Sequence, residues 1–184
     1  MIIDALYNEA TDVIDHLRSA DEISLALDAE RHFNKIFVLS CASYFEKELQ
    51  TIVKQFVATV SRNDQRLISF VDNKAIAFQY HTYFNWGERN NPDKPGKNAN
   101  TFLSLFGEEF KKRFADLIQG SPQLEEAIKA FIELGHLRNI LVHSNFAAYD
   151  NLQRTLLEHR KLFDKAQHFV HVVRNELRLS PDNG

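Results

Sequence analysis

The chain has 184 residues, of which 44% are hydrophobic and 26% charged, with a net charge of −3 at pH 7. These values are typical of one soluble globular domain, and no apolar run approaches the roughly 20 residues that a membrane-spanning helix needs. The first residues lack the basic start and apolar centre of a secretory signal, and the single Cys41 excludes an internal disulfide. We therefore expect a cytoplasmic protein with no membrane association.

Acidic side chains are concentrated at the start of the chain. Residues 1–33 contain eight Asp and Glu against two Arg, whereas the rest of the sequence carries a small basic excess. This balance is far from the strongly basic surface of a protein that coats nucleic acid. A compact site that needs only local positive charge is compatible with it.

Apolar residues recur at helical spacing almost throughout, and no alternating run of β-branched residues predicts a sheet. No Gly or Pro interrupts this pattern before residue 87. The first half therefore predicts three helices: residues 3–19, residues 28–60 with Ser24 or Asp28 as the cap, and residues 65–77, which Asp72 and Asn73 could end early.

Residues 79–99 are predicted to form one long inserted loop, because residues 90–96 are rich in turn formers and helix breakers. Two interpretations of this loop stay open. Trp86 and its aromatic neighbours could stack RNA bases while Lys94 and Lys97 contact phosphates. Alternatively, the aromatic side chains hold the loop against the core and the lysines are simply solvated.

Helical spacing resumes at Asn100, and Gly107 and Gly120 are suitable points for helices to end. Ser121 followed by Pro122 is a favourable start for the next helix, since serine caps well and proline fits the first turn.

The last helix is predicted over about residues 151–179, because Asp150 and Gln153 have the spacing of a capping box. Residues 180–184 should form a flexible tail. The whole pattern predicts an all-α up-and-down bundle with one inserted loop, formed by a single domain over residues 1–179.

Arg138, Asn139 and His143 place a cation, an amide and an imidazole within six residues of an apolar helical stretch. Arginine binds a phosphate through its planar guanidinium in a fixed geometry, and histidine exchanges protons near neutral pH. The trio therefore suits metal-free cleavage of RNA next to a 2′-hydroxyl, and no cofactor is needed. The alternative is structural: an arginine paired with a carboxylate and a histidine that packs at an interface.

The same trio has the form of the R-x4-H motif of the HEPN superfamily of all-helical ribonucleases. Residues 41–49 (Cys-Ala-Ser-Tyr-Phe-Glu-Lys-Glu-Leu) resemble the segment of small, aromatic and acidic residues on the second helix of these domains. Residues 106–110 (Phe-Gly-Glu-Glu-Phe) resemble a mid-chain element of the RiboL-PSP type of HEPN protein.

This resemblance implies a HEPN-like bundle and a homodimer in which the motifs of two chains line one cleft. It also implies an endoribonuclease of single-stranded RNA in a toxin, antiphage or stress-response system, with a cognate antitoxin or regulatory protein as a further partner. Some HEPN-like domains are instead non-catalytic dimerisation or protein-interaction modules, and this alternative stays open.

Site residues follow from the motif and the resemblance. Arg138 and His143 are the candidate catalytic residues, with Asn139 as a positioning residue. Glu46 lies on the helix that faces the motif in similar proteins, so it either orients the Arg or His or is an exposed partner of Gln50. No metal site is predicted, because the remaining histidines lack the spacing of a known zinc motif. The two sets considered were His168 with His171, and Glu133 with His136 and His143.

Overall fold

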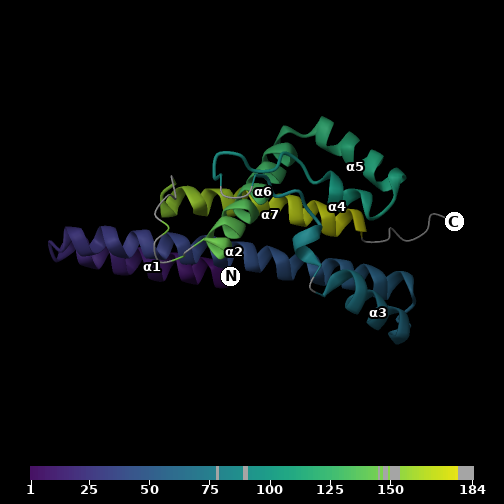
Figure 1. Ribbon diagram of the computed structural model, residues 1–184, viewed down its shortest axis with the longest axis horizontal. Coiled ribbons are helices and arrows are strands. Elements are labelled where there is room, and N and C mark those ends of the chain that lie inside the picture. The colour runs from purple at the N-terminus through teal and green to yellow at the C-terminus, as the bar shows by residue number, and fades with distance from the viewer. Residues whose placement is uncertain (78, 89–90, 145, 147–148, 150–153, 178–184) are drawn as a thin grey trace.

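The computed structural model describes residues 1–77, 79–88, 91–144, 146, 149 and 154–177. Over these residues the fold is an all-α bundle (Figure 1), as the sequence predicts, with one isolated antiparallel bridge between Gly87 and Pro95. Its helices are α1 (Ile2–Ser19), α2 (Ile23–Val60), α3 (Gln65–Val71), α4 (Asn100–Ser104), α5 (Glu108–Gly120), α6 (Pro122–His143) and α7 (Leu156–Leu177).

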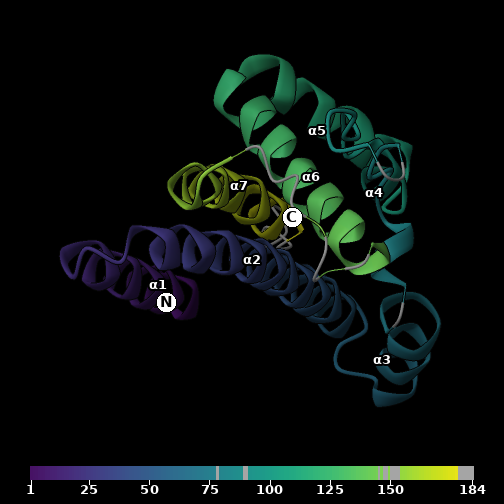
Figure 2. The same cartoon turned by 60° about the vertical axis from the view of Figure 1, so that its left-hand side comes forward.

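The long helix α2 is the centre of the fold. α1 turns back at Ala20–Glu22 and lies along the first part of α2, while α6 and α7 pack on α2 and on each other (Figures 1 and 2). The buried residues of α1 (Ile3, Ala10 and Ile14) fall on one helical face. Those of α2 spread over several faces because α1, α3, α6 and α7 all contact it.

Aromatic rings fill the space between α2, α6 and α7. The ring centroids of Phe45 and Phe163 lie 5.0 Å apart, as do those of Phe131 and Phe169. Phe84 of the inserted loop joins them, with its centroid 4.9 Å from that of Phe131. Tightly packed rings of this kind remove large apolar areas from water and fix the positions of neighbouring helices.

The inserted loop between residues 79 and 99 is present where the sequence predicts it. Tyr80, Tyr83 and Phe84 are buried, and Tyr83 Oη donates a hydrogen bond of 2.6 Å to the Ala75 carbonyl. The interpretation in which aromatic residues hold the loop against the core is therefore confirmed for these three side chains.

The predicted start of the second helix was wrong. α2 begins at Ile23 rather than at residue 28, and its cap is Glu22, which makes no side-chain capping bond. Neither Ser24 nor Asp28 caps it. The Ala26 amide already donates to the Glu22 carbonyl at 2.9 Å, and Ala26 is buried, so packing sets this boundary.

Other predicted boundaries have mixed outcomes. Ser121 caps α6 as expected, with its hydroxyl accepting from the Leu124 amide at 3.2 Å. Gly107 has a φ of +94° and separates α4 from α5, and Gly120 is the last residue of α5. α3 ends at Val71, and the chain continues as a π-helical turn over Asp72–Ile76.

The start of α7 differs from the prediction. The helix begins at Leu156, and the capping box is Thr155 with Glu158: the Thr155 amide donates to the Glu158 carboxylate at 2.8 Å, and the Glu158 amide donates to the Thr155 hydroxyl at 3.2 Å. Asp150, Gln153 and the predicted tail 180–184 lie outside the described residues. No helix in the described part of the chain is long and apolar enough to span a membrane.

Candidate functional site

The motif residues lie on the last turns of α6. Arg138 and Asn139 are half-buried and His143 is exposed, while the neighbouring Leu137, Ile140 and Leu141 are buried. The apolar residues fix the rotation of α6 against α2, where Leu137 and Leu141 form a small cluster with Val38. Burial of one face therefore directs the polar side chains to the other.

Asn139 contacts Arg138 directly. Its Oδ1 atom accepts a hydrogen bond of 3.0 Å from Arg138 Nη1. The bond restricts the guanidinium. A guanidinium has five donors, and among the described residues the other N–H groups of the Arg138 guanidinium have no hydrogen-bond partner, so they can bind an anion. The structure thus gives Asn139 a hydrogen-bond partner in Arg138, whereas the sequence suggested that Asn139 positions His143 or the phosphate.

The motif residues face a cavity of about 590 Å³. Glu46 of α2 lines this cavity together with Arg138, Asn139 and His143. The cavity is completed by further residues of the loop and of α6: Tyr80, His81, Phe84, Asn85, Trp86, Gly87, His136 and Ile140. A volume of this size is in the usual range for small-molecule and cofactor sites.

Tyr80 lines the cavity together with Glu46 and Arg138. Burial and then the negative charge of Glu46 raise the pKa of the Tyr80 hydroxyl well above its usual value, and the positive charge of Arg138 opposes this. Both charges therefore act on one buried hydroxyl. Glu46 lies at the site rather than on a remote face of α2.

Trp86 holds the inserted loop against α6. A Cβ atom at Gly135 would come within 2.0 Å of the indole, so only glycine admits the ring at this point of the helix. The indole Nε1 donates to the His81 carbonyl at 3.1 Å. Gly135, which contacts the loop, and Arg138 of the motif thus lie within one turn of α6.

His136 makes a second connection between loop and helix. Its ring is buried, and its Nε2 atom lies 2.7 Å from the Asn91 carbonyl. A carbonyl only accepts, so Nε2 carries the proton and donates. The sequence suggested His136 only as a member of a metal site. Its position two residues before Arg138 could have indicated that it lies near the motif.

Lys94 and Lys97 do not line the cavity. Lys94 forms an ion pair of 2.8 Å with Glu88, and Lys97 is exposed. Trp86 lines the cavity, but its ring is also packed against α6. Contact of these three residues with RNA stays a prediction.

His81 and Asn85 are cavity residues that the sequence did not identify. Each is next to an aromatic residue of the loop in the sequence, and this proximity could have indicated that they lie at the site. Of the metal sets considered, Glu133 instead binds Arg154, and His171 bonds to Asn175. No group of three potential metal ligands occurs among the residues that the structure describes.

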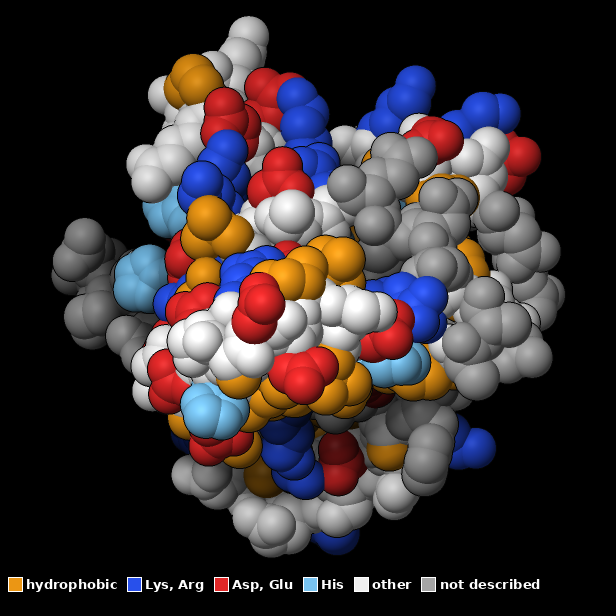
Figure 3. Space-filling model, turned by 90° about the vertical axis from the view of Figure 1, so that its left-hand side faces the viewer, with side chains coloured by type: hydrophobic (Ala, Val, Ile, Leu, Met, Phe, Trp, Pro, Cys, Tyr) orange, Lys and Arg blue, Asp and Glu red, His pale blue; other side chains and the backbone are white. Residues whose placement is uncertain are grey.

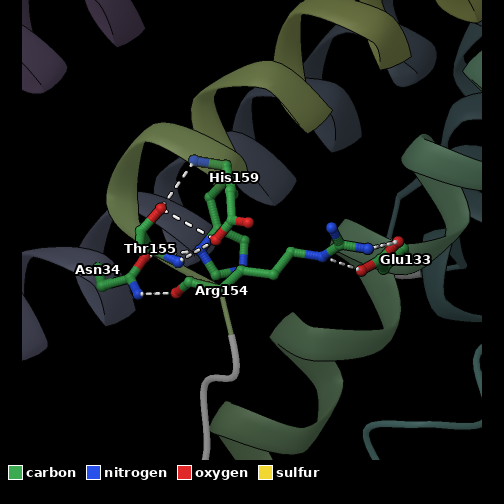
Figure 4. Close-up of polar contacts among 6 residues, drawn as sticks. Asn34, Glu133, Arg154, Thr155 and His159 are labelled. Atoms are coloured by element: carbon green, nitrogen blue, oxygen red, sulfur yellow. Dashed lines mark hydrogen bonds and ion pairs between the residues drawn. The ribbon is translucent and has the colours of Figure 1, made fainter.

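A polar network fixes the chain at Arg154, immediately before α7 (Figure 4). Asn34 Nδ2 donates to the Arg154 carbonyl at 2.6 Å, and the Arg154 guanidinium binds both carboxylate oxygens of Glu133, at 2.7 and 3.2 Å. Nearer to the motif, the buried Lys35 donates to the Phe146 carbonyl at 3.2 Å. Two consecutive residues of α2 therefore hold the chain at Phe146 and at Arg154.

His159 belongs to the same network and is fully buried. Its Nδ1 atom lies 2.6 Å from Asn34 Oδ1. Because Asn34 Nδ2 donates to a carbonyl, Oδ1 must accept, so Nδ1 of His159 carries the proton. Nε2 has no hydrogen-bond partner among the described residues, and burial lowers the pKa of His159 to about 4, with the charge of Arg154 acting in the same direction.

The face of the molecule at the α1–α2 turn carries charges of both signs (Figure 3). On the face at the α1–α2 turn, acidic and basic side chains are mixed and hydrophobic side chains lie between them (Figure 3). No broad basic area is seen among the described residues of this face.

The comparison with protein families agrees with this fold. The family model described as RiboL-PSP-HEPN matches residues 4–178, nearly the whole chain. The protein therefore belongs to the RiboL-PSP-HEPN family, and the predicted HEPN-like all-α fold is confirmed. Neither the curated proteins nor the solved structures contain a match to this chain.

Proposed function

We propose that the protein is a metal-independent endoribonuclease that cleaves single-stranded RNA. The observation that carries this proposal is the position of Arg138, Asn139 and His143 on one wall of a cavity, with Glu46 of α2 beside them. An open cavity with a cation, an imidazole and a carboxylate offers charge stabilisation and proton transfer in one place. Membership of the HEPN family is compatible with ribonuclease activity.

In the proposed reaction, His143 accepts the proton of the ribose 2′-hydroxyl as that oxygen attacks the adjacent phosphate. Arg138 stabilises the negative charge that develops on the phosphate oxygens. Asn139 holds the guanidinium through the 3.0 Å hydrogen bond, and Glu46 orients Arg138 from α2. The products are a 2′,3′-cyclic phosphate and a free 5′-hydroxyl.

A homodimer is part of the proposal. Val142, Phe146 and Ile36 are large apolar side chains that are 51%, 38% and 41% exposed. Val142 precedes His143, and the Phe146 ring lies over Lys35, the neighbour of Ile36. Exposed apolar groups beside a functional motif are typical of protein contacts. Light scattering that gives a monomer mass at micromolar concentration and at every salt concentration would contradict the dimer.

The same apolar side chains support a second candidate, a non-catalytic dimerisation or protein-interaction module. The family also suggests a place in a toxin, antiphage or stress-response system, with a cognate antitoxin as partner. Both candidates predict association, so only an activity measurement separates them.

The test is incubation of the purified protein with single-stranded RNA in excess EDTA. We expect cleavage that leaves 2′,3′-cyclic phosphate ends, and DNA of the same sequence should survive because it lacks the 2′-hydroxyl. His143→Ala protein, purified identically, controls for contaminating nucleases. Cleavage that disappears in EDTA and returns with magnesium would overturn the mechanism, since metal-dependent nucleases use ions to activate the nucleophile. No cleavage of any RNA would favour the module.

A further inference from the structure

The proposed reaction needs a second proton transfer. When the 2′-oxygen attacks, the bond between phosphorus and the 5′-oxygen breaks, and this oxygen leaves as an unstable alkoxide unless it is protonated. A positioned general acid typically contributes about 10²–10⁴ in rate to such a step. Histidine is the side chain best suited to this role near neutral pH.

Three histidines line the cavity: His81, His136 and His143. His143 is the proposed base. His136 is buried, and its Nε2 proton is engaged by the Asn91 carbonyl. His81 is exposed, and its ring has no hydrogen bond to the residues that the structure describes. Of the three imidazoles, His81 is therefore the one whose nitrogens are accessible for a second proton transfer.

His81 is also held in place from both sides. It lies in a single 3₁₀ turn, Tyr80–Thr82, in which Tyr80 is buried and the Thr82 hydroxyl donates to the Gln79 carbonyl at 2.7 Å. Its carbonyl accepts from the indole of Trp86, which is itself packed against Gly135. The backbone at position 81 is thus fixed to α6 while the imidazole is left accessible.

The position of His81 relative to Arg138 suits a general acid that protonates the leaving oxygen. The two residues line the main cavity together and also share a second, smaller cavity next to it. A phosphate bound by Arg138 in either cavity would share that cavity with His81. His81 comes from the loop and His143 from the end of α6, so two different elements supply the two imidazoles.

We propose that His81 is the general acid of the cleavage reaction, an inference that rests on the ribonuclease function proposed above. The proton of the 2′-hydroxyl passes to His143 as the new bond between the 2′-oxygen and phosphorus forms. The protonated His81 gives its proton to the departing 5′-oxygen as the old bond breaks. His143 ends protonated and His81 neutral, and exchange with water restores both.

The experiment uses a leaving group that needs no proton. The bond that the wild-type protein cleaves is first mapped in an RNA oligonucleotide. A second oligonucleotide then carries a bridging sulfur in place of the 5′-oxygen at that bond, because a thiolate departs without a general acid. Cleavage of both substrates is measured for the wild type, His81→Ala and His143→Ala, with His16→Ala as the matched control. His16 is an exposed histidine of α1 that does not line the cavity.

His81→Ala should slow cleavage of the oxygen substrate by roughly 10²–10⁴. The same variant should cleave the sulfur substrate at a rate within a few-fold of that of the wild type. His143→Ala should lose both activities, because the nucleophile still needs a base. His81→Ala keeps the carbonyl that binds Trp86, so its thermal unfolding should match that of the wild type.

Equal loss on both substrates would mean that His81 only supports the structure, and full activity on the oxygen substrate would mean that it transfers no proton. Either result overturns the inference and leaves the ribonuclease function intact. A wild-type protein that cleaves neither substrate overturns both proposals.

Discussion

The indole of Trp86 lies against the backbone of Gly135, three residues before Arg138 on the same helix, and leaves no room for a side chain. The contact joins the inserted loop to the motif helix. It therefore links the stability of the fold to the shape of the cavity.

Gly135→Ala should destabilise the protein. Helix propensity alone favours Ala over Gly by about 1 kcal/mol, but the new Cβ would lie 2.0, 2.4 and 2.8 Å from three ring atoms. The indole cannot easily move, because it also packs against Tyr80, Phe84 and Phe131. Overpacking typically costs about 1–3 kcal/mol, so we expect a net loss in the free energy of unfolding measured in urea.

Gly120→Ala is the matched control for this effect. It lies at the end of α5, and a Cβ there would meet no atom within 4 Å. Its unfolding midpoint should equal or exceed that of the wild type. A Gly135→Ala protein as stable as Gly120→Ala would contradict the close contact with Trp86.

His143→Ala and Arg138→Ala should remove RNA cleavage without unfolding the protein. His143 is exposed and Arg138 half-buried, so neither substitution leaves a cavity in the core. Loss of the arginine should reduce the rate by roughly 10²–10³, by analogy with the loss of a group that stabilises developing charge. Rates are measured on a defined oligonucleotide and folding by circular dichroism.

Arg66→Ala provides the control, since its side chain is 93% exposed and does not line the cavity. Wild-type rates for either motif variant, or unfolding of both, would show that the assigned roles are wrong.

The stability of the protein should fall between pH 6.5 and pH 4 because of His159. In the unfolded chain this imidazole has its ordinary pKa of about 6.5. In the folded protein burial lowers the pKa to about 4, so the imidazole binds a proton only at lower pH. The unfolded state therefore holds more protons in this window, and the free energy of unfolding decreases as the pH falls. Between pH 6.5 and pH 4 the free energy of unfolding should decrease by about 3 kcal/mol in total. Above pH 6.5 the contribution of His159 to this free energy is constant.

His159→Gln tests this assignment. A glutamine amide does not titrate and can still donate to Asn34 Oδ1. We expect the difference between urea midpoints at pH 7.5 and pH 5 to be smaller in the variant than in the wild type. Parallel pH dependence in the two proteins would exclude His159 as the cause.

The thiol of Cys41 should resist modification in the native protein. Its side chain is fully buried, and burial raises the pKa of the thiol, which disfavours the reactive thiolate. We expect no reaction with a disulfide reagent over minutes in buffer and one equivalent in denaturant. Fast reaction of the native protein would show that α2 opens locally at this residue.

The sequence by itself determined the helices and the composition of the motif. Helical spacing located all the long helices, because each must bury an apolar face, and Ser121 with Pro122 defined the start of α6 to the residue. It also placed Asn139 and His143 one turn apart, since backbone geometry alone fixes that relation.

Only the tertiary structure decided what surrounds the motif. Glu46 and His81 lie far from Arg138 in sequence, and they line its cavity because α2 packs on α6 and Trp86 fits against Gly135. The start of α7 also depends on long-range contact, since Asn34 of α2 binds both the Arg154 carbonyl and His159. Such relations arise from burial and hydrogen bonding between distant segments, and periodicity along one segment carries no information about its partner.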